Sequence, residues 1–134
     1  MERVCMLKTR QIPQSDYVIY EKKADQAFQA MLVLSESKLW TPVGREAVFT
    51  CINITDALLA RHKQLRNISK DHMSILKVMS LLPIKEASKQ ENRLRKVIVI
   101  KNLVDYENKD FTTKQAEDVM KNAERFYKWG KEHL

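Results

Sequence analysis

The sequence predicts an all-α protein that folds as one antiparallel, up-and-down bundle of four to five helices. A chain of 134 residues is the usual length for a single core. Two glycines and three prolines are too few for the many tight turns of a β fold. Apolar residues also recur at helical spacing along most of the chain. We expect one domain over residues 15–134, preceded by a polar lead-in over residues 1–14.

The first helix is expected to begin at Ser15 and Asp16, which are good N-cap residues. Apolar side chains then follow one helical face as far as Leu32. Thr41 and Pro42 predict the start of a second helix, because proline is well suited to the first turn. Its apolar residues occupy two opposite sides: Val48, Cys51, Ile52, Leu58 and Leu59 on one, and Phe49, Ile54 and Ala57 on the other. We therefore expect the second helix to lie centrally.

Residues 62–68 are expected to form a loop, and Ser69 with Asp71 to start a third helix that ends before Pro83. Its apolar positions are Ile75, Val78, Met79 and Leu82.

A fourth helix is predicted from Glu86 to Tyr106, with Leu94, Val97 and Ile98 as its apolar stripe. The β-branched run over residues 97–100 leaves a short buried strand as the alternative.

The last helix has the clearest start, because Thr112 and Gln115 form a capping-box pair. Its residues at helical spacing are Ala116, Val119, Met120, Ala123, Phe126, Tyr127 and Gly130. The aromatic residues near its end, including Trp129, are expected to pack in the core rather than to stack on bases.

The composition restricts the possible functions. A net charge of +7 is compatible with a polyanionic partner such as nucleic acid, although charge bears on association rather than on fold. The scarcity of glycine excludes Rossmann and P-loop phosphate sites, and we expect no cofactor. Two cysteines, Cys5 and a buried Cys51, favour a reducing compartment, and we expect a cytoplasmic protein with no signal peptide and no membrane span.

Polar residues continue the stripe of the predicted fourth helix. Lys101 and Asp105 lie one turn apart on one face, and Asn102 and Tyr106 form a second pair beside them. The cluster is either an ordinary helix end, a polar group that determines helix packing, or a functional site.

This part of the chain resembles the HEPN domain family. The similarity consists of the KNxxDY pattern from Lys101 to Tyr106, a short acidic loop to Phe111, the capped helix start, and the AERFxxW run over residues 123–129. The helices expected in the amino-terminal half and the KDH stretch ending at His72 are also similar, so the resemblance covers roughly residues 16–134. It implies a prokaryotic helical bundle that forms a homodimer with a shared cleft.

The resemblance also implies a function. Many HEPN proteins are metal-independent ribonucleases, often toxins, that use an arginine and a histidine. Here Lys101 and Tyr106 stand at those two positions, and tyrosine is a poor general base at neutral pH. We therefore expect a non-catalytic module that binds RNA or a nucleotide, or pairs with a minimal nucleotidyltransferase as in toxin–antitoxin modules. A ribonuclease with diverged residues is the alternative.

Specific roles follow for the cleft. Lys101 would contact phosphate, Asn102 and Asp105 would orient Lys101, and Tyr106 would offer a hydroxyl or a stacking face. Arg93 would lie about two turns before Lys101.

Two other constellations are weaker. Arg66 and His72 match the arginine-to-histidine spacing, but in the wrong part of the chain, and such a match is expected by chance. His62, Asp71 and His72 lack the spacing of known metal motifs, so we predict no metal site.

Overall fold

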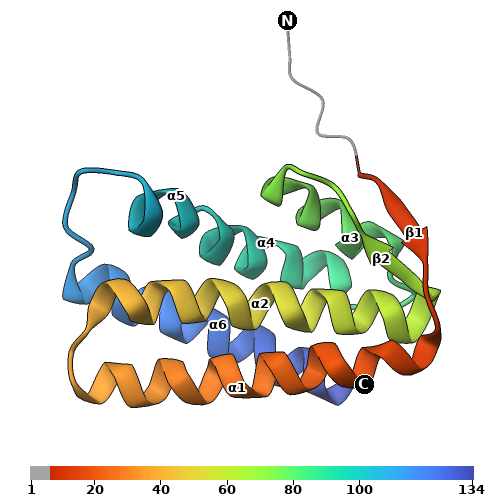
Figure 1. Cartoon of the computed structure of the whole chain (residues 1–134), viewed down its shortest axis with the longest axis horizontal. Helices are drawn as coiled ribbons and strands as arrows, with labels where there is room; N and C mark the ends of the chain where they lie inside the picture. Colours follow the sequence, from red (N-terminus) through yellow and green to blue (C-terminus); the bar gives the residue numbers. More distant parts are fainter. Residues whose placement is uncertain (1–6) are drawn as a thin grey trace, which may run out of the picture.

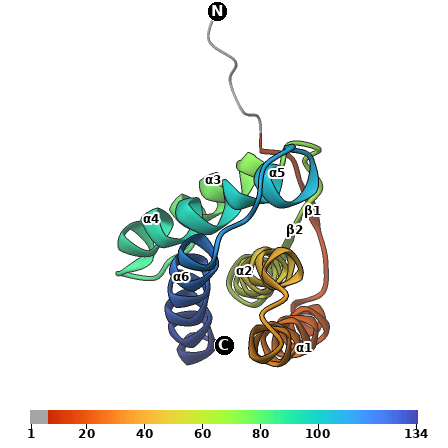
Figure 2. The same cartoon turned by 90° about the vertical axis from the view of Figure 1, so that its left-hand side faces the viewer.

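The protein is predominantly α-helical, as the sequence predicts. The computed structural model describes residues 7–134. Its α-helices are α1 (Tyr17–Glu36), α2 (Trp40–Lys63), α3 (Ile75–Leu81), α4 (Ala87–Ile98), α5 (Ile100–Asp105) and α6 (Thr113–Glu132). Short 3-10 helices, η1 (Gln14–Asp16) and η2 (His72–Ser74), precede α1 and α3. Helices α1 and α2 lie side by side, and α6 packs against α2 and α4 (Figures 1 and 2).

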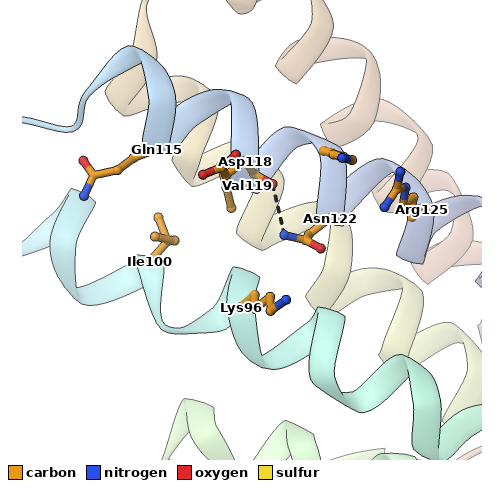
Figure 3. Close-up of a pocket in the computed structure, with 8 residues that line it drawn as sticks. Lys96, Ile100, Gln115, Asp118, Val119, Asn122 and Arg125 are labelled. Carbon is orange, nitrogen blue, oxygen red and sulfur yellow. Dashed lines mark hydrogen bonds between the residues drawn. The ribbon is translucent and has the colours of Figure 1, made fainter.

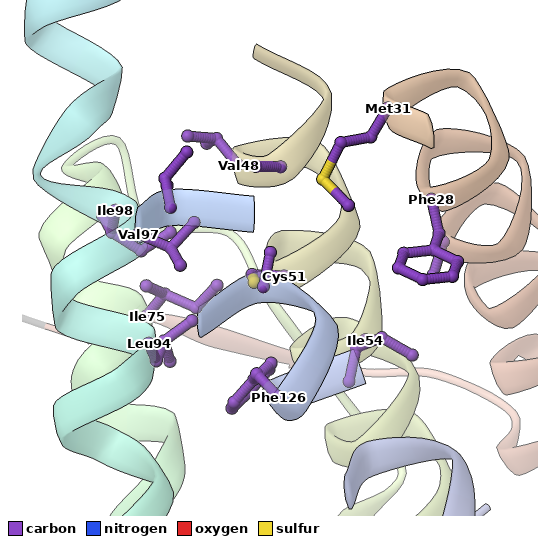
Figure 4. Packing of buried hydrophobic residues seen from close by; sticks show 14 of the residues in the cluster. Phe28, Met31, Val48, Cys51, Ile54, Ile75, Leu94, Val97, Ile98 and Phe126 are labelled. Carbon is purple, nitrogen blue, oxygen red and sulfur yellow. The ribbon is translucent and has the colours of Figure 1, made fainter. Parts of the chain in front are cut away.

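Helix α2 occupies the centre, as its two apolar sides predict. It contacts α1, α3, α4, α5 and α6, and the side chains of Cys51 and Ile54 are fully buried. Figure 4 shows Ile54 near Phe28 of α1 and Phe126 of α6. Burial raises the pKa of the Cys51 thiol, which agrees with the predicted structural role. The exception is Phe49, which was expected on an inner face and is 57% exposed.

A small two-stranded sheet was not predicted. Strand β1 (Thr9–Gln11) pairs antiparallel with β2 (Leu65–Asn67), so the expectation of a loop over residues 62–68 is wrong. Helix α2 continues to Lys63, and Gln64 ends it in the left-handed region with a φ of 53°. Gln64 turns the chain out of the helix, so the backbone N–H and C=O groups of β2 have no helical partners. Strand β1, within the polar lead-in, supplies their hydrogen-bond partners.

The predicted fourth helix is interrupted once. Helices α4 and α5 are separated by Val99 alone, whose φ of −63° and ψ of −21° stay in the right-handed helical region and whose N–H still donates to the Arg95 carbonyl oxygen at 3.1 Å. Leu94, Val97 and Ile98 are fully buried in helical conformation, so the alternative of a strand is wrong. Four consecutive β-branched residues have low helix propensity, which accounts for a break at this point.

Two helix starts follow their sequence signals, at Thr112 and at Asp71. The prediction that Ser15 or Asp16 caps the first helix is wrong, because both residues lie in η1 and α1 has no side-chain cap. Thr112 and Gln115 form the capping box, with the Thr112 N–H donating to Gln115 Oε1 at 2.9 Å and the Gln115 N–H to Thr112 Oγ1 at 3.1 Å. The Asp71 side chain accepts from the Met73 N–H at 2.9 Å and so caps η2. The capping box fixes the start of α6, which packs against α2 and α4.

Candidate functional site

The polar cluster on α5 gains a third charged residue from α2. Asp105 Oδ2 accepts a hydrogen bond from Lys101 Nζ at 3.2 Å, one helical turn away. Its other oxygen, Oδ1, accepts from Arg45 Nε at 3.0 Å. Arg45 therefore joins α2 to α5, and the three side chains form one ion cluster with a single carboxylate between two cations.

Gly44 allows α5 to come this close to α2. A Cβ atom at Gly44 would lie 2.8 Å from both Val104 Cγ1 and Phe111 Cε1, closer than real Cβ contacts. Glycine at this position thus permits the backbone of α2 to approach the end of α5. Arg45 follows directly and is brought within reach of Asp105.

A cavity of about 200 Å³ opens beside the ion cluster. Its floor is apolar and its rim is charged; it is lined by Arg45, Val48, Phe49, Ile52, Lys101, Val104 and Asp105. Val48 and Val104 are buried, whereas the Phe49 ring at the mouth is largely exposed. An exposed aromatic ring next to an apolar hollow is an arrangement typical of protein interaction surfaces.

The cluster holds one carboxylate between two cations and so keeps a net positive charge. The hydrogen bond from Arg45 lowers the pKa of Asp105, and Lys101 adds to the effect. The carboxylate therefore stays ionised at neutral pH, and the lowered pKa makes it a weak general base. Because Lys101 already pairs with Asp105, less of its charge is free for a phosphate than the sequence suggests.

The other predicted cleft residues are placed differently. Tyr106 is 77% exposed, and Lys101 Nζ lies 5.7 Å from the centre of its ring, within cation–π range. The Asn102 carbonyl accepts from the N–H groups of Tyr106 and Glu107 and so ends α5. Arg93 does not line the cavity; its Nη1 donates to Gln90 Oε1 at 3.1 Å on α4. Lys101, Asp105 and Tyr106 thus lie close together, whereas Arg93 contacts Gln90 on α4 and lies outside the cavity.

Arg66 and His72, which match the arginine-to-histidine spacing, lie on separate elements, β2 and η2. Arg66 lies on β2, opposite Arg10 of β1, and its charge lowers the pKa of Asp56 on α2. His72 begins η2. Burial of Asp56 is the stronger influence and raises the pKa of that carboxyl to about 7. Arg66 is therefore the counter-charge of a partly buried acid.

The described histidines do not form a group of metal ligands. His62 Nε2 lies 2.7 Å from the carbonyl oxygen of His133, at the opposite end of α2 from the ion cluster. Over residues 7–134, no group of three or more histidine, cysteine, aspartate or glutamate side chains could hold a metal ion.

The aromatic residues of α6 pack inward, as predicted. Phe126 is fully buried, and Trp129 is 8% exposed and packs on it at 5.7 Å between ring centres. Tyr127 stacks on Phe28 of α1 at 4.3 Å. These rings are not available to stack on bases.

Sequence reasoning found α5 but missed Arg45 and the apolar cavity. Arg45 lies on a different helix and belongs to no local pattern, and only the close packing at Gly44 brings it to Asp105. Comparisons of the chain with family models, with curated proteins and with solved structures returned no match. None of the helices in the described part of the chain is long and apolar enough to cross a membrane.

Proposed function

We propose that this protein is a HEPN-like, non-catalytic binding module that forms a homodimer around the α2–α5 cavity. The helical bundle would be of the HEPN type, and the two copies would bring their Lys101 to Tyr106 segments to a shared cleft. RNA, a nucleotide or a minimal nucleotidyltransferase would then bind at that cleft. The cell compartment expected for such a module is the cytoplasm.

The observation that carries the proposal is the apolar cavity with Phe49 exposed at its mouth. A largely exposed phenylalanine beside buried valines gains free energy when a second protein surface covers it. The rim residues Arg45, Lys101 and Asp105 already satisfy one another. Their hydrogen bonds would not have to be broken for a partner to cover the apolar floor.

We expect wild-type protein to dimerise and Phe49→Glu to weaken the dimer at least tenfold, because the apolar ring that a partner would cover is replaced by a carboxylate that must be desolvated. Sedimentation equilibrium over a concentration series measures the dissociation constant. Ile68→Glu is the matched control, because Ile68 is 46% exposed and follows β2, away from the cavity. A wild-type monomer throughout the series, or equal weakening by both variants, would contradict the proposal.

The ribonuclease alternative has a separate test. We expect no cleavage of mixed RNA substrates in the presence of a chelator, because two cations lower the pKa of Asp105 and make it a weak base, and Tyr106 is a phenol. The comparison is with the double variant Lys101→Ala, Tyr106→Phe, purified in the same way. Cleavage by the wild type that is lost in the double variant would make the protein a ribonuclease with unorthodox residues.

A further inference from the structure

A second hollow lies on another side of α5, between α4 and α6. This groove has a volume of about 490 Å³ (Figure 3). Lys96 reaches it from α4, and Lys121 and Arg125 reach it from α6. Ile100 and Val119 are also among its lining residues. Residues from two antiparallel helices thus place three cations around one depression.

In the part of the chain that the structure describes, these three cations form no ion pairs. Within residues 7–134, neither Lys96, Lys121 nor Arg125 has an acidic group within 4.0 Å, although other basic residues of the same helices are paired. On α4 Arg95 pairs with Glu91 at 3.2 Å, and on α6 Lys128 pairs with Glu124 at 2.7 Å. The charge of the groove is therefore free to act on a ligand.

The groove also offers amide groups and holds one carboxylate. Gln115 Oε1 is occupied by the capping box, so its Nε2 remains to donate into the groove. Asn122 lines the groove and donates its Nδ2 to the Asp118 carbonyl oxygen at 3.1 Å. Asp118 contributes the one negative side chain of the lining. Three cations against one carboxylate leave a net positive charge.

We propose that the α4–α6 groove binds the phosphodiester backbone of a nucleic acid strand. Lys121 and Arg125 lie one helical turn apart, and Lys96 faces them from α4, so successive phosphates can contact different cations. Arg93, one turn before Lys96, extends the basic row along α4. None of the described residues that line the groove is aromatic, so we expect bases not to be stacked and binding to be independent of sequence.

This site is distinct from the cavity at Lys101. Lys101 pairs with Asp105, whereas among the described residues the groove cations have no acidic group within ion-pair distance. The inference does not depend on homodimer formation, and its failure is distinguishable from that of the proposed function. Phe49→Glu is expected to leave binding at the groove unchanged, and the groove variant is expected to leave the dimer unchanged.

The test is fluorescence anisotropy with a labelled 20-nucleotide oligo(U) RNA and the equivalent oligo(dT) DNA. The groove variant carries Lys96→Gln, Lys121→Gln and Arg125→Gln, all at exposed positions. We expect it to bind both strands at least tenfold more weakly than the wild type. Its logarithmic salt dependence should also fall by about 2, because three phosphate contacts are lost.

A second variant separates the site from overall charge. Lys22→Gln, Lys77→Gln and Lys109→Gln remove the same charge at exposed lysines outside the groove. Binding by this control within threefold of the wild type supports the groove. Equal losses in both triple variants, no binding of either strand by the wild type, or tighter binding of labelled poly-glutamate of equal charge would overturn the proposal.

Discussion

Gly130→Ala is expected to lower the free energy of unfolding by about 2–3 kcal/mol. A Cβ atom at Gly130 of α6 would overlap Ile54 Cγ2 of α2, and Ile54 is fully buried. In an open helix the same substitution would stabilise by up to about 1 kcal/mol, because alanine is the better helix former. Urea denaturation followed by circular dichroism measures the difference. An increase in stability would show that α2 and α6 do not approach this closely.

A double-mutant cycle makes the assignment specific. Ile54→Ala alone creates a cavity and should cost about 2–4 kcal/mol. In the double variant Ile54→Ala, Gly130→Ala the new methyl group occupies space that Ile54 leaves. The combined loss should therefore be smaller than the sum of the two single losses by about 1 kcal/mol or more. Additive losses would show that the effect of the Gly130→Ala substitution does not arise from its contact with Ile54.

Asp56→Asn is expected to raise the free energy of unfolding at pH 8 by about 2 kcal/mol, after allowance for the solvent that still reaches this carboxylate. Burial raises the pKa of Asp56 to about 7, against 3.8 for an ordinary aspartate. The folded state therefore holds the proton more tightly than the unfolded state. Stability should be full below pH 4, fall as pH rises toward 7, and then level off.

The measurement is the free energy of unfolding from pH 4 to pH 8 for the wild type and the variant. The neutral amide should flatten the fall over this range. Arg66→Gln should steepen it, because Arg66 opposes the rise in the pKa of Asp56. Asp110→Asn serves as the exposed control. An unchanged slope in Asp56→Asn would mean that the carboxylate is not destabilised by burial.

Local signals in the sequence predict most of the helical structure. The capping box at Thr112, the stripe through Leu94, and the two apolar sides of the second helix each act within a few residues, and each is found in the structure. The sheet was missed because β1 and β2 are short and polar, and their hydrogen bonds join segments far apart in sequence. The break at Val99 interrupts the helix for one residue, which periodicity does not resolve.

The candidate site is less predictable for the same reason. Spacing on one helix finds Lys101 and Asp105, because one turn separates them. It does not find Arg45, which meets Asp105 only because Gly44 permits close packing of two distant segments. It also misplaces Arg93, which hydrogen-bonds to Gln90 on α4 and does not line the cavity. Whether a basic residue is ion-paired depends on residues from other helices, and the local sequence pattern does not show those contacts.

The central position of α2 also bears on the order in which the protein folds. Helices α1 and α2 are joined by a short connection over residues 37–39, so their pairing closes a small loop and loses little chain entropy. Helix α6, in contrast, is separated from α2 in the sequence by α3, α4 and α5, so the packing of α6 on α2 closes a much longer loop. Contacts of low sequence separation form fastest. We therefore expect the α1–α2 hairpin to form early in folding, and the contact between Ile54 and Gly130 to form later.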